Sequence, residues 1–220
     1  MVNKLFKSSV GIILLTVFFV FLSSFYLFFY KNPNHSEWDW FFPLAVVVGA
    51  TLGMLVLPLI FIKYGLKENF TDFGFRFPEH KTKALVFAAL AIIFLTPALV
   101  YFSTLTPFKD FYLLGEKARS GGYFLIVTIF SLIYYSSEEF LFRGFLFWGL
   151  WRKLKYHSFW LNGLIFAFFH LTKPPLEILF AFFVSFIFCF LSLKFRSFVP
   201  SALAHFGIAL ALNFLINFGF

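Results

Sequence analysis

The chain has 220 residues, of which 61% are hydrophobic and 13% are charged, and 41 of them are Phe. A soluble domain is roughly 45–50% apolar and about 25% charged. This composition therefore excludes a free water-soluble protein, a disulfide scaffold and a disordered chain. The formal net charge is +8, but the basic residues lie in short clusters between apolar runs. Such clusters are typical of membrane loops and not of a nucleic-acid-binding surface.

Long apolar runs separated by short polar or Pro-containing loops dominate the sequence. A bilayer-spanning helix needs about 20 apolar residues. Seven runs meet or approach this length, at residues 8–30, 41–62, 84–106, 122–150, 158–172, 175–193 and 198–218. The 122–150 run exceeds one straight crossing, so we expect it to be tilted, kinked or extended past the interface. The pattern predicts an all-α, polytopic integral membrane helix bundle of about seven to eight transmembrane helices, with 64–83 or 107–121 as candidates for an eighth, partly inserted segment.

Lys and Arg orient such a bundle, because cytoplasmic loops carry an excess of them. We take the first span as uncleaved and place the N-terminus in the cytoplasm. Twelve basic residues then fall on the cytoplasmic side, five on the outer side and one, Arg143, within a span. The inner set is Lys4, Lys7, Lys63, Lys67, Arg76, Lys81, Lys83, Arg152, Lys153, Lys155, Lys194 and Arg196; the outer set is Lys31, Lys109, Lys117, Arg119 and Lys173. The split predicts a cytoplasmic N-terminus and an outer C-terminus. A compact chain with short loops suits a prokaryotic inner (cell) membrane.

Inside the apolar runs we single out the ionisable residues Glu138, Glu139, Arg143, His170 and His205. Each costs at least about 2.5–3.5 kcal/mol near the bilayer centre, so such residues face the bundle interior and usually mark a functional site. At 1.5 Å per residue, Glu138 and His170 lie roughly 20 and 18 Å from the cytoplasmic ends of their runs, and His205 roughly 10 Å. We expect these three to converge at a similar depth. The alternative is a buried structural salt-bridge network.

Helix geometry separates the two glutamates. Glu139 and Arg143 are spaced i,i+4 and share one helix face, where a carboxylate and a guanidinium pair well. Glu138 points about 100° away and has no cation on its own face of the helix. We therefore interpret Glu139–Arg143 as a supporting pair and Glu138 as the free carboxylate and candidate base.

The sequence disfavours other hydrolytic mechanisms. It contains no GxSxG nucleophile motif and no HExxH zinc-binding helix, and Cys189 has no His in its run. A zinc ion held by Glu138, His170 and His205 remains geometrically allowed. The residues themselves favour general acid–base chemistry in a bundle interior.

The motif string also resembles a known family. Glu138 to Arg143 reads EExxxR, Phe166 to His170 reads FxxxH, and His205 follows in a later apolar run. This order and spacing resemble the CPBP family, which comprises CAAX prenyl endopeptidases and bacteriocin-processing membrane proteases and is also called type II CAAX or Abi. EExxxR within a span is a specific signal, whereas FxxxH is weak in a chain so rich in Phe.

The resemblance covers roughly residues 70–217, including a Thr71–Arg76 loop that looks like the family's. It leaves residues 1–69 as generic N-terminal spans of a single membrane-embedded domain, 1–220. It implies a metal-independent glutamic endopeptidase without a cofactor, open toward the cytoplasmic half of the bilayer. The implied partners are membrane lipid and a peptide or protein segment, such as a C-terminal or lipid-modified one; nucleic acid is not among them.

The resemblance assigns a role to each motif residue. Glu138 together with His170 would activate a water molecule, and His205 would stabilise the tetrahedral oxyanion. The supporting residues would be Glu139, Arg143 and Phe166.

The third motif departs from the family pattern. It is usually HxxxN or HxxxD, but the fourth position after His205 is Ala209. Asn213 lies about 12 Å from His205 along a helix axis and Asn162 belongs to another run, so these two are the candidate polar groups for the oxyanion. Losing one oxyanion donor typically costs about 10²–10³ in rate. The alternatives are therefore a catalytically degenerate CPBP-like binding, sorting or immunity protein, or a proton-coupled transporter, which would need its polar groups spread along a pathway.

Overall fold

The computed structural model describes residues 7–23, 41–114 and 121–219, and these parts of the chain contain helices and no strands. Five helical stretches are long and apolar enough to cross a membrane: Pro43–Leu66, Lys81–Thr104, Gly122–Leu154, Pro175–Phe195 and Val199–Phe218. Two further apolar helices, Ser9–Ser23 and His157–Phe169, are shorter. The all-α class is confirmed and the long apolar helices indicate an integral membrane protein. The count of seven to eight crossings stays a prediction.

The helices follow the predicted runs. Five runs form single helices: α2 (Ser9–Ser23), α6 (Lys81–Thr104), α10 (His157–Phe169), α11 (Pro175–Phe195) and α12 (Val199–Phe218). The second run forms α4 (Phe41–Ala50), η1 (Thr51–Val56), α5 (Leu57–Ile60) and η2 (Phe61–Leu66) without a break, and the fourth forms α8 (Gly121–Glu139), η5 (Phe140–Leu146) and α9 (Phe147–Leu154). The end of the first run, 24–30, lies outside the described residues.

The two segments considered for an eighth insertion contain only short elements where the structure describes them. Residues 64–83 hold the end of η2, the single 3₁₀ turn η3 (Phe70–Phe73) and the first residues of α6. Residues 107–121 hold most of α7 (Thr106–Tyr112), which has 7 residues. Neither η3 nor α7 reaches the roughly 20 residues that a crossing needs.

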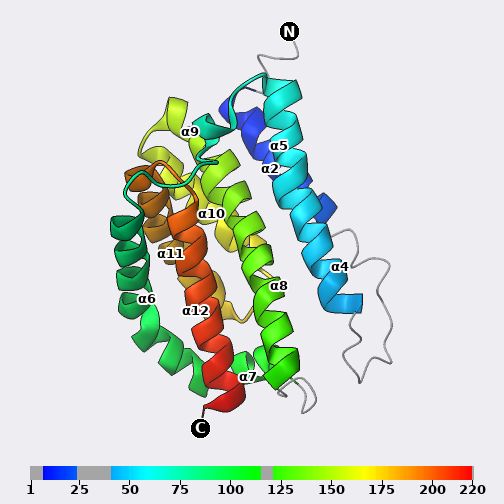
Figure 1. Ribbon diagram of the computed structural model, residues 1–220, viewed down its shortest axis with the longest axis vertical. Helices are drawn as coiled ribbons and strands as arrows, with labels where there is room; N and C mark the ends of the chain where they lie inside the picture. Colours follow the sequence, from blue (N-terminus) through cyan, green and yellow to red (C-terminus); the bar gives the residue numbers. More distant parts are fainter. Residues whose placement is uncertain (1–6, 24–40, 115–120, 220) are drawn as a thin grey trace.

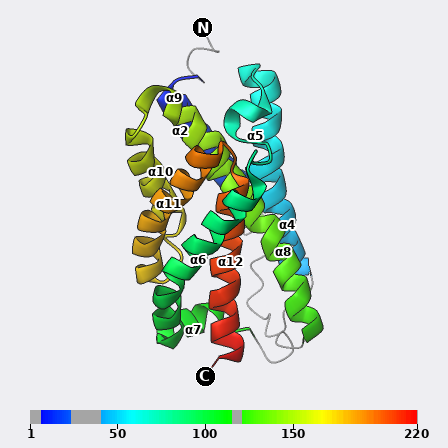
Figure 2. The same ribbon diagram turned by 60° about the vertical axis from the view of Figure 1, so that its left-hand side comes forward.

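Helices α8 and α12 pack together along the middle of the bundle (Figures 1 and 2). Helix α12 also packs against α6 and α11, and α10 packs against α11, whereas α2 and α4 contact α8 or its continuation from the other side. One apolar core joins both sides, because Ile12, Met54, Phe145, Phe166 and Ala202 belong to one buried cluster. The N-terminal helices thus help to hold the helices that carry the sequence motifs.

The outer surface of the bundle is strongly apolar. Large side chains such as Leu14, Phe94, Phe168 and Phe183 are more than half exposed. Exposed apolar surface on this scale is unfavourable in water but matches lipid chains. The apolar surface and the length of the apolar helices therefore both indicate a membrane environment.

The fourth run departs from one straight α-helix through the π-helix η5, whose seven residues are all buried. A π-helix changes the i→i−4 hydrogen-bond pattern and leaves carbonyl groups that need other partners, and a bilayer offers no water to supply them. Asn162 of α10 donates Nδ2–H to the carbonyl of Phe142 at 2.7 Å, and Ser192 of α11 donates its hydroxyl to that of Arg143 at 2.9 Å. Polar side chains of two neighbouring helices thus stabilise η5.

An ion-pair cluster joins three segments at the α9 end of the bundle. Glu68, which follows η2, pairs with Lys7 before α2 at 3.1 Å and with Arg152 of α9. Burial acts to raise the pKa of Glu68, but hydrogen bonds from Arg152 and Lys7 outweigh it, so the pKa lies below its ordinary value. The stabilisation is therefore present above the usual titration range of a carboxyl and is lost as pH falls through the lowered pKa.

Gly53 of η1 allows a close approach to α2. A Cβ added at Gly53 would lie 2.5 Å from the Cβ of Ser23, so we predict that Gly53→Ala lowers the free energy of unfolding by about 1–3 kcal/mol. At Gly122 no described atom lies within 4 Å of an added Cβ, and Gly122→Ala should stabilise the helix slightly because Ala is the better helix former. Thermal unfolding in detergent compares the two variants. Equal midpoints would contradict the close packing.

Candidate active site

A cavity of about 770 Å³ lies between α7, α8, α10, α11 and α12, with side chains of α2 and α4 on one side. Most of its wall is apolar. Glu138, His170 and His205 all line it, so the three residues predicted as catalytic face one common space.

The centre of the polar network is the carboxylate of Glu139. Its Oε1 accepts from Nη1 of Arg143 at 2.9 Å and from Nδ1 of His205 at 2.8 Å. All three side chains are buried, Arg143 and Glu139 completely. The expected i,i+4 pair is therefore present, and it also fixes the imidazole of His205 from α12, which the sequence did not reveal.

Aromatic rings surround the guanidinium of Arg143. Its Cζ lies 3.9 Å from the ring centroid of Phe166, 5.0 Å from that of Phe188 and 5.8 Å from that of Phe142. A desolvated cation gains from such ring faces. The Phe166 ring is also 4.5 Å from the ring of His170 and 5.8 Å from that of His205, measured between centroids. Phe166 therefore packs between both histidines and the arginine.

Glu138 remains outside this hydrogen-bond network. Its side chain is buried, and among the described residues Oε1 has no hydrogen-bond partner. The nearest nitrogen in ion-pair range is Nδ1 of His205, at 3.9 Å. A buried carboxylate oxygen without a partner is unusual. Its place on the cavity wall agrees with the expectation that Glu138 is the free carboxylate of the pair.

His170 follows directly after the last residue of α10. Its Nδ1–H donates to the carbonyl of Phe166 at 2.8 Å, which leaves Nε2 as the unprotonated ring nitrogen of the neutral imidazole. Among the described residues no direct hydrogen bond joins His170 to Glu138. The two share the cavity wall, where a water molecule could contact both.

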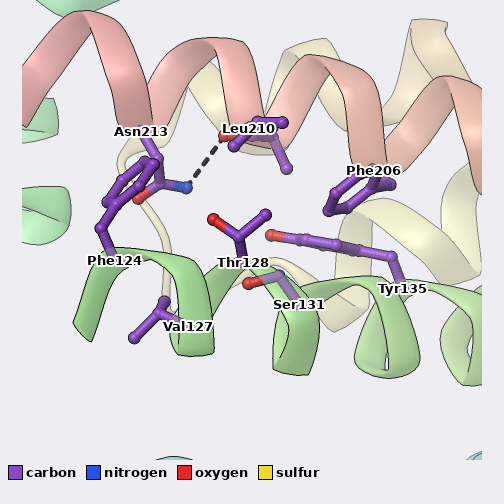
Figure 3. Close-up of a pocket in the computed structure, with 9 residues that line it drawn as sticks. Phe124, Val127, Thr128, Ser131, Tyr135, Phe206, Leu210 and Asn213 are labelled. Atoms are coloured by element: carbon purple, nitrogen blue, oxygen red, sulfur yellow. Dashed lines mark hydrogen bonds between the residues drawn. The ribbon is translucent and has the colours of Figure 1, made fainter. Parts of the chain in front are cut away.

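The two candidate asparagines have other partners. Asn162 is fully buried, donates to Phe142 and accepts from Ser185 at 3.0 Å, and does not line the cavity. Asn213 lines the cavity but donates Nδ2–H to the carbonyl of Ala209 on its own helix at 2.9 Å (Figure 3). Neither amide is bonded near His205, so the proposed mechanism leaves both out.

Figure 3 shows a small pocket between α8 and α12 beside the main cavity, where Asn213 lies with Thr128, Ser131 and Tyr135. Its volume of about 10 Å³ approaches that of a single water site. The Tyr135 ring lies 4.4 Å from that of His205, centroid to centroid. Tyr135 is a site neighbour that sequence reasoning missed, although its i,i+3 spacing from Glu138 places both on one helix face.

Sequence reasoning also missed a second polar group on the cavity wall, formed by Tyr112, Lys173 and Glu177. Lys173 was assigned to an outer loop, and the other two were not singled out. The available signal was Glu177, an acidic residue inside the apolar run 175–193.

Glu138, Glu139 and His205 could in principle hold a metal ion, since one ligand atom of each lies within 4.8 Å of the others. However, Oε1 of Glu139 is already bonded by Arg143 and His205. A metal ion bound to this carboxylate would compete electrostatically with the buried guanidinium of Arg143, although Oε2 of Glu139 has no hydrogen-bond partner among the described residues. His170, the third ligand of the zinc site that the sequence allowed, is not part of this group.

We predict that Glu139→Gln and Glu138→Gln differ in stability. Removing the charge of Glu139 leaves Arg143 buried without its carboxylate, which should cost about 3–5 kcal/mol. Glu138→Gln removes a charge that has no hydrogen-bond partner at Oε1, so unfolding should change little. Thermal unfolding and the yield of monodisperse protein in detergent measure both. A Glu139→Gln variant as stable as Glu138→Gln would contradict the central role of the Glu139 carboxylate.

Comparison with known proteins gives one match. Residues 120–211 match the family described as type II CAAX prenyl endopeptidase Rce1-like. No curated protein and no solved structure matches the chain. The matched segment contains EExxxR, FxxxH and His205, which the structure gathers around one cavity. The chain therefore carries, over residues 120–211, a domain of the Rce1-like type II CAAX prenyl endopeptidase (CPBP) family.

Proposed function

We propose that this protein is an intramembrane endopeptidase in which Glu138 activates a water molecule to hydrolyse a peptide bond. The observation that carries the proposal is the buried carboxylate oxygen of Glu138, which has no hydrogen-bond partner among the described residues and belongs to a side chain on the cavity wall. The family match supports proteolysis as the reaction. The substrate is a peptide or protein segment that reaches the cavity from the membrane.

The proposed reaction begins with a water molecule between Glu138 and His170. The carboxylate of Glu138 accepts a proton from it, while Nε2 of His170 accepts a second hydrogen bond and orients it. The resulting hydroxide attacks the carbonyl carbon of the substrate. Glu138 then transfers the proton to the leaving amine. A positioned general base of this kind contributes about 10²–10⁴ to the rate.

His205 stabilises the oxyanion in this mechanism. Glu139 accepts from Nδ1–H of the ring at 2.8 Å, so in this mechanism His205 acts as the imidazolium, whose second proton on Nε2 is donated as a hydrogen bond to the oxyanion. A carboxylate that fixes a histidine in this way sets the orientation of the ring. Glu139, Arg143 and Phe166 thus act as positioning residues.

The proposal includes a topology with the α9 end of the bundle in the cytoplasm of a prokaryotic cell. Lys63, Lys67, Arg152 and Lys153 gather at that end, to which the positive-inside rule assigns the cytoplasmic side. The other end, with α7 and the end of α12 (Figure 1), then faces outward. Because residues of α7 and of the start of α11 line the cavity, this topology places the cavity nearer the outward end of the bundle, which disagrees with the expected opening toward the cytoplasmic half of the bilayer.

The test is a proteomic comparison of C-terminal protein fragments in membranes. Cells without the protein are complemented with the wild type or with Glu138→Gln, His170→Ala or His205→Ala. We expect fragments that depend on the wild type to fall by at least about 10² with each variant, because the base, the water ligand or the oxyanion donor is lost. The variant proteins should accumulate normally.

Exposed residues provide the matched controls. Glu79→Gln and His157→Ala make the same chemical changes at exposed positions and should leave the fragments unchanged. Full cleavage by Glu138→Gln would overturn the mechanism.

Metal independence is tested separately. Purified active protein should contain far less than one equivalent of zinc, and chelators should leave its activity unchanged, because the carboxylate of Glu139 already pairs with Arg143 and His205. Near-stoichiometric metal, together with activity that is lost on chelation and restored by zinc, would identify a metalloenzyme instead.

One observation favours a second candidate, a catalytically degenerate binding or sorting protein. Ala209 lines the cavity one turn after His205, where the family pattern has an Asn or Asp, and an alanine side chain offers no donor. This candidate predicts that a membrane protein co-purifies equally with the wild type and Glu138→Gln while no fragment depends on Glu138.

A further inference from the structure

Three polar residues form a second cluster on the cavity wall, apart from the network of Glu139, Arg143 and His205. Tyr112 of α7 donates its hydroxyl to Oε1 of Glu177 at 2.5 Å, and Nζ of Lys173 donates to the same hydroxyl at 3.1 Å. All three residues line the cavity that also contains Glu138 and His170. The mechanism proposed above uses none of the three.

The cluster is held from several directions. Nζ of Lys173 lies 4.4 Å from the ring centroid of Phe111 and 4.8 Å from that of Tyr112. Asn217 of α12 donates to the carbonyl of Tyr112 at 3.2 Å and so fixes the end of α7. The backbone N–H of Lys173 donates to the carbonyl of His170 at 2.9 Å. Lys173 is thus in the same turn as a residue of the proposed catalytic centre.

The hydrogen-bonding capacity of the cluster is only partly used. Oε2 of Glu177 is buried and has no hydrogen-bond partner among the described residues. The ammonium of Lys173 has three donors, of which one reaches Tyr112. The cluster therefore offers an unused acceptor and unused donors side by side in an apolar cavity, where unsatisfied polar groups are unfavourable.

A peptide amide has the complementary pair of groups, because its carbonyl accepts and its N–H donates. A free carboxylate would suit Lys173 but would be repelled by Glu177. The rest of the cavity wall is mainly apolar and suits aliphatic or aromatic side chains. The geometry favours an uncharged main-chain group over an anion.

We propose that Lys173, Tyr112 and Glu177 form a main-chain anchor that binds one amide group of an apolar peptide segment, with Lys173 donating to its carbonyl and Glu177 accepting its N–H. The peptide nature of the occupant rests on the function proposed above. The anchor fixes the register of the peptide relative to Glu138, and so determines which bond lies beside the activated water.

The test measures binding, without hydrolysis, to the Glu138→Gln protein in detergent. The probe is a dansylated octapeptide of alternating Leu and Ala with an amidated C-terminus. In a scan, each internal amide is replaced in turn by an ester, which removes one N–H. We expect one ester position to weaken binding by about tenfold or more, since it leaves the Glu177 oxygen unpaired, and the others to have much smaller effects.

Variants of the protein link that selective loss to the cluster. When Glu177→Leu is added to the Glu138→Gln protein, the sensitive ester and its parent amide should bind with equal affinity. Adding Lys173→Met should weaken binding of every peptide by about tenfold, whereas Lys109→Met, an exposed lysine on the same helix as Tyr112, should not. The ester scan itself uses the Glu138→Gln protein with Tyr112, Lys173 and Glu177 unchanged. Misfolding of a cluster variant therefore cannot mask its result.

Several results would overturn the anchor: no saturable binding of the octapeptide, equal losses at all ester positions, or a selective loss that persists in Glu177→Leu. A free-acid peptide that binds at least tenfold more tightly than its amide, with the gain lost in Lys173→Met, would assign the site to a carboxylate instead. Selective ester sensitivity without any hydrolysis by the wild type would contradict the proposed function alone. Hydrolysis without ester selectivity would contradict the anchor alone.

Discussion

The rest of the site depends on the hydrogen bonds that the carboxylate of Glu139 accepts from Arg143 and His205. A buried arginine inside a membrane bundle is tolerable only when it is paired, and Glu139 provides that pair one turn away. The same oxygen binds His205 and so ties α12 to the junction of α8 and η5. The neighbouring Glu138 takes no part in these bonds: its side chain lines the cavity, and its buried Oε1 has no hydrogen-bond partner among the described residues.

The π-helix that follows this pair links the fold to the site. Arg143 lies within η5, which is entirely buried. Its carbonyl and that of Phe142 find partners on α11 and α10, so the neighbouring helices are joined to the arginine backbone as well as packed around its side chain. The aromatic rings around the guanidinium come from the same two helices and from η5. Folding of the bundle and positioning of the charged groups are therefore one process.

Much of the architecture could be predicted from the sequence because membrane insertion depends on apolar length. Each predicted run corresponds to a helix in the described residues, and the Glu139–Arg143 pair follows from helical spacing alone. The π-helix could not be predicted, since no hydrophobic period distinguishes it from an α-helix in a run where nearly every residue is apolar. Its presence also explains why Asn162, a candidate oxyanion donor from the sequence, instead bonds a backbone carbonyl.

The convergence of Glu138, His170 and His205 was predicted, but individual contacts of the site were predicted only where they lie within one helix. The bond between His205 and Glu139 joins residues 66 positions apart, so spacing could not show which glutamate the histidine would contact. Lys173 follows a helix end and precedes Pro174, which is typical of an exposed loop. In the structure this turn instead brings the lysine against Phe111 and Tyr112 of α7. Counting charges on the assumption that every loop residue is solvated cannot detect a loop lysine that packs back against the bundle.

The departure of the third motif has a physical counterpart on α8. Ala209 and Tyr135 line the same small pocket, and the Tyr135 ring packs 4.4 Å from that of His205. A longer side chain at position 209 would compete with that ring for the space beside the histidine. Ala209 and Tyr135, one turn before Glu138, thus lie on opposite helices around one pocket beside His205. The two positions have to be considered together, because a substitution at either changes the packing of His205, whose Nδ1 is held by Glu139.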